Sequence, residues 1–277
     1  MGFRINTNIA SISAQRSLGV NNRESESNLA KLSSGSRINK ASDDAAGLAI
    51  SEKMKASIRS MKQADRNAND GISMVQTAEG GLNEVSSILT RMRELAIQTA
   101  SDTVGDVERG FTNMEYQNLK QELDRISQVT EFNGQKLLDG NGKKYDFQIG
   151  VNNNEFQDRI SYDSNFVNSK IENLGVAELD VSTKEGSQSS LQALDSAIEK
   201  TSGFRSFLGA IQNRLVSTSN NLQVTTENLS AANSRIRDVD YADATAQQAK
   251  NSILNSAGTS VLAQANMNGQ NALKLIG

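Results

Sequence analysis

The chain has 277 residues, a net charge of −3 from 29 basic and 32 acidic side chains, and no proline, cysteine, histidine or tryptophan. Without histidine and cysteine it can form neither a Ser-His-Asp or Cys-His catalytic group nor a zinc site with nitrogen and sulfur ligands. Its charges are mixed along the chain, so we expect neither a nucleic acid nor a membrane as a partner. No apolar run reaches the roughly 20 residues that a membrane span needs, and the first residues lack the pattern of a cleavable secretory signal.

The first part of the chain, residues 5–34, has a loose helical pattern of apolar residues. Gly35 follows it and can take the left-handed conformation that ends many helices. Ser42, Asp43 or Asp44 can then cap the next helix at its N-terminus. We interpret the two aspartates as caps rather than as a metal or acid–base pair, because no partner carboxylates lie near them in the sequence.

The next segment, about residues 45–100, carries a ladder of mainly apolar residues that steps alternately by four and three. A repeat of about 3.5 residues predicts a long helix that buries one narrow stripe against another helix. We expect the glycines inside it to bend the helix or to permit close approach of a neighbour. A third helix is expected over 106–129. The ladder consists of Met54, Ile58, Met61, Asp65, Ala68, Ile72, Val75, Glu79, Leu82, Val85, Leu89, Met92, Ala96 and Thr99, with Gly71, Gly80 and Gly81 beside it.

The middle of the chain, residues 132–185, changes to the alternating pattern and turn signals of short strands. We expect strands at 145–149 and 156–162, joined as hairpins. The loop at Asp139 superficially suggests a calcium site, but Gly140, Gly142 and Lys143 do not fit an EF-hand, so a plain turn is the better interpretation.

The C-terminal part is expected to contain a short helix at 188–200, a break at Ser202 and Gly203, a second ladder and a last helix beyond Asp240. Pairing of the two ladders brings the chain's ends together. The fold class expected is mainly α, an elongated antiparallel coiled-coil or helical-bundle rod with a small β-hairpin region in the middle. The second ladder consists of Leu208, Ile211, Leu215, Thr218, Leu222, Thr225, Leu229, Ala232, Ile236 and Val239.

The sequence shows no candidate for catalysis, a cofactor or a metal: Gly-rich phosphate motifs are missing, and charged residues fall at the outer positions of the ladders. We therefore predict no enzyme. The densest charged cluster is at residues 91–95, where Arg91 and Glu94 can pair on the outer face of the helix. Intrahelical pairing is one interpretation, and a contact surface for another chain is the other.

Several segments resemble bacterial flagellins. The N-terminal ones are Ile5-Asn6-Thr7-Asn8, Leu32-Ser33-Ser34-Gly35-Ser36-Arg37-Ile38-Asn39, Asp43-Asp44-Ala45-Ala46-Gly47-Leu48-Ala49-Ile50 and Arg93-Glu94-Leu95-Ala96-Ile97-Gln98. The C-terminal ones are Leu208-Gly209-Ala210-Ile211-Gln212-Asn213-Arg214 and Ala257-Gly258-Thr259-Ser260-Val261-Leu262-Ala263-Gln264-Ala265-Asn266. The resemblance covers about residues 1–135 and 188–277, so the chain is similar to a short flagellin without the variable outer domains.

The resemblance implies a structural subunit of the extracellular flagellar filament, exported unfolded through the flagellar type III channel and assembled by pairing of its terminal helices. It also implies an order of segments: an N-terminal inner-core helix at 1–42, long tube-layer helices at 43–131, a small β region at 132–187, C-terminal tube-layer helices at 188–238 and a C-terminal inner-core helix at 239–277. The implied partners are other copies of the chain, an export chaperone, the filament cap, hook-junction proteins and toll-like receptor 5.

The same resemblance implies which residues take part in assembly and in receptor contact. Inner-core assembly is expected from Ile5, Ile9, Ile12, Val261, Leu262, Leu273 and Leu275. The tube-layer core is expected from Ile58, Ile72, Leu82, Leu89, Leu215, Leu222 and Leu229. The receptor contact is expected from Arg91, Leu95 and Glu115, whereas Thr90 replaces the glutamine common in strongly recognised members.

Other functions stay open at this point. A hook–filament junction protein or a needle-type secretion subunit would share the terminal heptads, and a helical-bundle binding module could remain monomeric. A flagellin-associated protease is disfavoured, since the outer insert and the His-Glu-x-x-His ligands are both missing.

Overall fold

The structure is a computed structural model that describes residues 7–274, with side chains described over 7–267. In that range the chain is mainly helical, and its four short strands form two antiparallel pairs, which confirms the expected fold class. The helices are α1 (Ile9–Ser34), α2 (Ala45–Thr99), α3 (Asp106–Val129), α4 (Glu155–Asp158), α5 (Ile171–Leu174), α6 (Lys184–Arg237) and α7 (Tyr241–Lys274). The strands are β1 (Glu131–Phe132), β2 (Gln135–Lys136), β3 (Lys144–Gln148) and β4 (Arg159–Asp163).

The chain divides into two compact units. Unit 1 contains the residues up to Ala56 and those from Asn228 onward, and unit 2 runs from Ser57 to Glu227. Unit 1 therefore holds α1, α7, the first turns of α2 and the last turns of α6. Unit 2 holds the remainder of those two long helices, together with α3 and all four strands.

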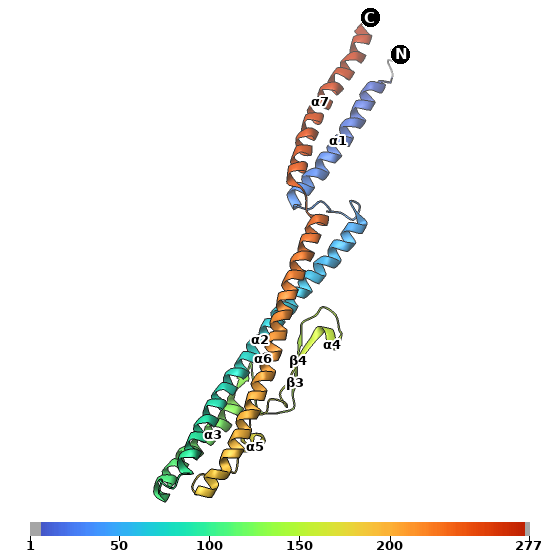
Figure 1. Ribbon diagram of the computed structural model, residues 1–277. Coiled ribbons are helices and arrows are strands. Elements are labelled where there is room, and N and C mark those ends of the chain that lie inside the picture. The colour runs from blue at the N-terminus through green and yellow to red at the C-terminus, as the bar shows by residue number, and fades with distance from the viewer. Residues whose placement is uncertain (1–6, 275–277) are drawn as a thin grey trace. The chain divides into compact units, whose positions relative to one another are not determined.

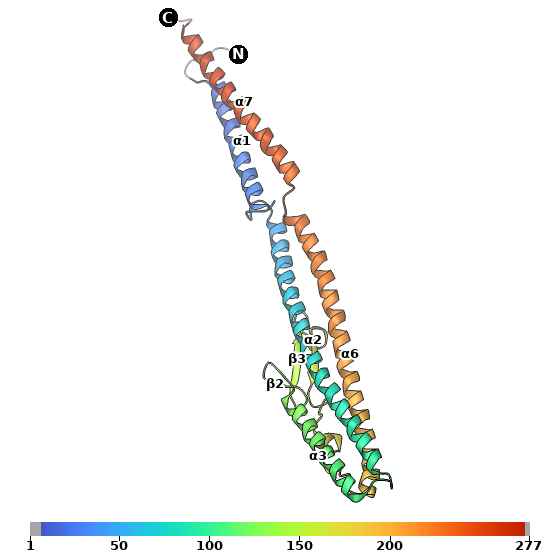
Figure 2. The same ribbon diagram turned by 90° about the vertical axis from the view of Figure 1, so that its left-hand side faces the viewer.

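The centre of unit 2 is an antiparallel contact between α2 and α6, which lie side by side in both ribbon views (Figure 1, Figure 2). Ser219 Oγ donates to Asp65 Oδ1 over 2.6 Å, and Arg93 Nε donates to Asp195 Oδ1 over the same distance. Later residues of α2 thus meet earlier residues of α6. Both ladders enter one core, which confirms that they pair; its members include Ala68, Val75, Leu82, Leu208, Ile211 and Leu215.

The buried face of α2 is wider than the ladder. Met74, Ala78 and Leu95 lie outside the stripe and are also buried. They are covered because α3 and the strands pack on α2 beside α6, with Tyr116 and Leu123 of α3 fully buried in the second core cluster. A narrow two-helix seam was therefore too simple an expectation for unit 2.

Of the three glycines beside the ladder in α2, two allow the β region to approach closely. A Cβ at Gly71 would lie 3.0 Å from Phe147 Cδ1, and one at Gly81 would lie 2.7 Å from Thr130 Oγ1 and 2.8 Å from Leu138 Cδ1. Gly80, between them in the sequence, faces open space. Close approach is therefore the reason for Gly71 and Gly81, and neither close approach nor packing explains Gly80.

The β region differs in one detail from the expectation. Strand β3 pairs with β4 in the register Tyr145 to Tyr162, but residues 155–158 form the helical turn α4 instead of strand. The cause is Asn154, whose Oδ1 accepts from the backbone N–H groups of Phe156 and Gln157 and caps a helix start. The Asp139 loop is a turn in which Asp139 Oδ1 accepts from the N–H of Asn141 at 3.2 Å.

The expected break at Ser202 and Gly203 is wrong, because α6 is continuous from Lys184 to Arg237. Thr201 is fully buried and its Oγ1 donates to the Ala197 carbonyl at 2.8 Å. Phe204 packs against both core clusters. Burial on either side offsets the roughly 1 kcal/mol that a glycine costs in a helix relative to alanine.

The helix ends of unit 1 follow the expected capping. Gly35 ends α1 with a φ of 68°, and Asp44 Oδ1 accepts from the Gly47 N–H at 2.8 Å at the start of α2. Asp43 instead accepts from the N–H groups of Lys40 and Asn39, and these bonds lower the pKa of its carboxyl. Asp44 therefore caps α2, whereas Asp43 binds N–H groups of the loop before the helix, so only one of the two aspartates is a helix cap.

The glycine contacts make a testable prediction. Gly81→Ala places a methyl group against Thr130 and Leu138, and we expect it to lower the free energy of unfolding by about 1–3 kcal/mol. Gly80→Ala is the matched control: it meets no atom and should raise the free energy by up to about 1 kcal/mol through helix propensity. Urea unfolding of the monomer measures both, and equal stabilisation by the two substitutions would contradict the close approach.

Candidate interaction surfaces

The described residues hold no group of three or more carboxylate, histidine or cysteine side chains that could bind a metal ion. Over the same residues, no helix combines the length and apolar character needed to cross a membrane. Two surface features are candidates for function: an apolar surface on the terminal helices and a charged cluster on α2 and α3.

The first surface belongs to the pair of terminal helices, α1 and α7, which run antiparallel and side by side (Figure 1, Figure 2). Polar side chains hold the pair at both ends. Asn8 Nδ2 donates to the Ala265 carbonyl at 2.8 Å, Asn28 Nδ2 donates to the Ala244 carbonyl at 2.7 Å, and Tyr241 donates to the Leu32 carbonyl. These side-chain-to-backbone bonds fix the register of the two helices, and the pattern of apolar residues in the sequence gives no sign of them.

The apolar side chains of this pair lie mostly outside its contact. Helix α1 has no buried residue along its length, and in α7, over the residues 241–267 whose side chains are described, the buried positions are the small or polar Ala244, Asn251 and Ala265. The exposed large apolar residues of the two helices include Ile9, Ile12, Val20, Leu29, Tyr241, Ile253, Leu254, Val261 and Met267. The monomer thus leaves an apolar surface over α1 and α7 unfilled.

The residues expected for inner-core assembly fall on this surface where the structure describes them. Ile9, Ile12 and Val261 are exposed, and Leu262 is half-buried. Ile5 and Leu275 lie outside the described residues, and Leu273 lies in α7 beyond the range of described side chains.

The residues expected for the tube-layer core are buried to different degrees. Leu82, Leu89, Leu215 and Leu222 are buried, and the partly buried Ile72 packs against the core that contains Leu82 and Leu215. The two outermost residues, Ile58 and Leu229, are only half-buried.

The second surface is a charged cluster on α2 and α3. The Arg91 guanidinium donates to Glu115 Oε1 at 2.9 and 3.0 Å and to Glu94 Oε2 at 3.0 Å. These bonds raise the pKa of Arg91, the one to Glu115 most strongly. All three side chains are about half exposed or more. The intrahelical pair expected from the sequence is therefore present, and a second pair to α3 joins it.

Leu95 is placed differently from the other two residues of the expected receptor contact. Its side chain is only 2% exposed and packs in the core with Met92 and Tyr116. Arg91 and Glu115 thus form the accessible part of this surface, and Leu95 lies among the core residues that support it.

Arg109 is a buried charged residue that no motif in the sequence predicts. Its Nε donates to the Thr99 carbonyl at 3.0 Å, its Nη2 to the Ser101 carbonyl at 3.0 Å, and its Nη1 to Asp106 at 2.9 Å. Arg109 therefore satisfies carbonyl groups at the C-terminal end of α2 and holds the turn that leads into α3.

Comparison with known proteins accounts for nearly the whole chain. The model of the bacterial flagellin N-terminal helical region matches residues 5–143, and that of the bacterial flagellin C-terminal helical region matches residues 191–276. A flagellin from Halalkalibacterium halodurans is 46% identical over 98% of this chain and 99% of its own length. A flagellin from Bacillus subtilis is 43% identical over 99% of this chain and 100% of its own length.

Two solved structures of flagellar proteins are also similar to this chain. A crystal structure of Bacillus cereus flagellin is similar with a TM-score of 0.50 and 29% identity, covering 61% of this chain and 94% of that one. The structure of a flagellar hook-associated protein from Vibrio parahaemolyticus has a TM-score of 0.57 at 15% identity, which shows a shared fold and no more. Because two family models match most of the chain and the curated relatives match over nearly its full length, the protein belongs to the bacterial flagellin family.

Proposed function

We propose that this flagellin is a structural subunit of an extracellular flagellar filament for swimming motility, and that copies of the chain assemble through α1 and α7. The observation that carries the proposal is the apolar surface of these two helices, which the monomer does not cover. The chain belongs to a family of structural proteins and contains no histidine or cysteine, and both facts favour assembly over catalysis. A relative from Treponema maltophilum, 39% identical over 98% of this chain, is named a flagellar filament core protein.

Burial explains why assembly would be favourable. Complete burial of one large apolar side chain contributes about 1.5–3 kcal/mol, and each terminal helix presents several. In the monomer these contacts are missing, so the pair relies on the hydrogen bonds made by Asn8, Asn28 and Tyr241. Packing between copies would supply the core that each α1–α7 pair lacks.

The segments expected from the sequence then receive separate roles. We assign 1–42 and 239–277 to an inner core of terminal helices. The segments 43–131 and 188–238 form a surrounding tube, and 132–187 forms its small β region. A chain with so short a middle segment has room for no large outer domain, which predicts a slender filament.

The remaining partners follow from this role. Export through the flagellar type III channel, a chaperone for the C-terminal segment, the filament cap and the hook-junction proteins are what a filament subunit requires. A hook–filament junction role is the alternative. It is disfavoured because the curated relatives that match nearly the whole chain carry flagellin and filament names.

The terminal-helix proposal is tested by Val261→Ser. Val261 is 59% exposed in the monomer, so the substitution should change the free energy of unfolding by less than about 0.5 kcal/mol. It should still reduce polymerisation strongly, because the side chain would be buried between copies. Val224→Ser is the matched control: Val224 is 58% exposed on α6 in unit 2.

Electron microscopy and sedimentation under polymerising salt measure the outcome. We expect long filaments from the parent chain and from Val224→Ser, and few or none from Val261→Ser. Equal assembly of the two variants would contradict a dominant role for the terminal helices.

We further propose that the surface around Arg91 and Glu115 contacts toll-like receptor 5. The support is the match of these residues to the family motif and their exposure on one face of α2 and α3. The ion pair also holds the guanidinium in a fixed position, which favours recognition by a partner.

The receptor proposal predicts that Arg91→Ala weakens binding of the receptor ectodomain at least tenfold, a loss of about 1.4 kcal/mol in binding free energy. Stability should change by less than about 1 kcal/mol, because the pairs of Arg91 are exposed. Arg125→Ala is the control, since Arg125 forms a comparable exposed pair with Glu122 on α3. Surface plasmon resonance checks the prediction, and an equal effect of the two substitutions would contradict it.

A further inference from the structure

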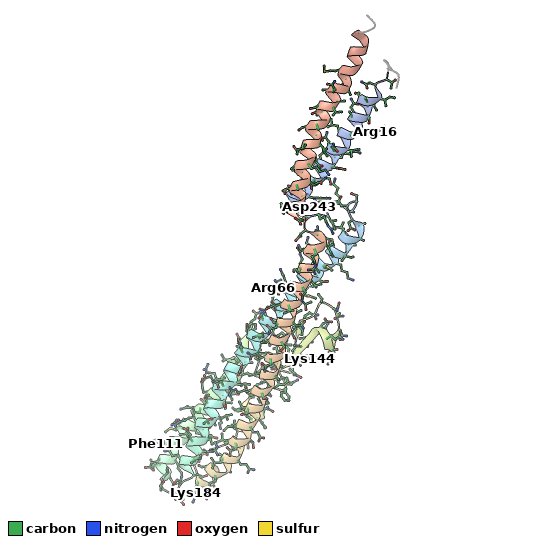
Figure 3. The ribbon with its side chains drawn as sticks, turned by 45° about the horizontal axis from the view of Figure 1, so that its top comes forward. Arg16, Arg66, Phe111, Lys144, Lys184 and Asp243 are labelled. Atoms are coloured by element: carbon green, nitrogen blue, oxygen red, sulfur yellow. The ribbon has the colours of Figure 1, made fainter. Side chains whose placement is uncertain are left out.

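An exposed apolar stripe lies at the start of α3. Val107, Phe111 and Met114 are 68%, 63% and 58% exposed, and their spacing of four and three residues places them on one helix face. Figure 3 labels Phe111 at the end of unit 2, near Lys184 at the start of α6. The opposite face of α3 carries the buried Tyr116 and Leu123. The stripe therefore has no packing role in the monomer.

An open groove lies elsewhere on unit 2, between the β region and α6. It has a volume of about 430 Å³, within the range of sites that accept an apolar group. Its apolar lining consists of the buried Ile149 and Ile160 and the exposed Phe156. Arg159, Arg214 and Ser217 contribute to its polar edge.

The charges beside the stripe and the groove are opposite. Asp106 and Glu108 lie in the first turn of α3, next to Val107. The groove carries Arg159 and Arg214. Among the described residues, neither the Glu108 carboxylate nor the Arg214 guanidinium has an ion-pair partner, whereas Asp106 pairs with Arg109. Each surface thus offers one free charge that the other could neutralise.

One copy of the chain cannot bring the two surfaces together. The stripe lies level with the end of α2. Arg91 of α2 bonds Glu115 of α3, and Arg109 of α3 bonds the carbonyl of Thr99, the last residue of α2. The groove lies near α2 residues 65–72, where Asn67 Nδ2 donates to the Gln148 carbonyl and Ser219 bonds Asp65. At 1.5 Å per residue these levels are about 40 Å apart along one helix.

We propose that the α3 stripe of one copy docks into the groove of the next copy, with Glu108 facing Arg214. The inference rests on the proposed filament function and names one of its contacts. Two different surfaces meet in this contact, so it is heterologous. A heterologous contact leaves a free stripe and a free groove at the ends and continues as an open helical array.

Cysteine cross-linking tests the contact directly, because the chain contains no cysteine of its own. Gly110→Cys places a thiol beside the stripe, where a Cβ meets no atom, and Ser217→Cys places one in the groove. The two single variants are mixed, polymerised and oxidised with copper phenanthroline. Disulfides need Cβ atoms about 3.5–4.5 Å apart, so a covalent dimer on a non-reducing gel reports direct contact.

The matched control replaces Ser217→Cys with Val216→Cys, an exposed neighbour on α6 that does not line the groove. We expect at least tenfold more dimer from Gly110→Cys with Ser217→Cys than from Gly110→Cys with Val216→Cys, and only after polymerisation. Filaments that form without this difference overturn the proposed contact and leave the filament function standing. Failure of the parent chain to polymerise at all would instead overturn the filament function and, with it, the contact.

Charge reversal provides an independent arm. Glu108→Arg and Arg214→Glu should each raise the critical concentration for polymerisation about three- to tenfold, because each places like charges in the contact. The double variant restores the opposite pair and should return to within about twofold of the parent chain. Additive losses in the double variant would contradict the pairing of Glu108 with Arg214.

Discussion

The antiparallel contact between α2 and α6 in unit 2 is the interaction on which the rest of that unit depends. It joins the N-terminal and C-terminal parts of the sequence through Leu82, Leu208 and Leu215, all fully buried. The other elements of the unit pack on this contact: α3 returns along α2 after a turn held by Arg109, and the β region approaches α2 at Gly71 and Gly81. A disturbance of the α2–α6 contact would therefore remove the support of the charged cluster around Arg91, of the α3 stripe and of the groove.

Burial is distributed unevenly between the two units. Unit 2 has two cores rich in leucine, whereas α1 in unit 1 has no buried residue. A helix pair that keeps its register by hydrogen bonds and leaves its apolar side chains outside is suited to packing against further copies. The stability of unit 2 and the capacity of unit 1 to assemble are thus separate properties of one chain.

Much of this arrangement could be predicted from local sequence. The bounds of α3, the cap at Gly35 and the pairing of the ladders follow from periodicity and from the chemistry of single residues. The continuity of α6 through Gly203 could not be predicted, because the burial of Thr201 and Phe204 on either side is a tertiary effect. The same holds for the burial of Leu95, since a seam between two helices does not reveal that a third helix covers another face. The contacts of Asn28 and Arg109 join residues to backbone carbonyls, which have no signature in the pattern of apolar residues.

The central claim is that α1 and α7 lack a core of their own and obtain one only from other copies of the chain. Hydrogen–deuterium exchange of the monomer and the assembled filament tests it most directly, because amide protection reports local stability. In the monomer, amides of residues 9–34 and 241–267 should exchange much faster than those of α2 and α6 in unit 2, and assembly should slow them by at least a hundredfold. Equal protection of the terminal helices and unit 2 in the monomer, unchanged in the filament, would contradict the account.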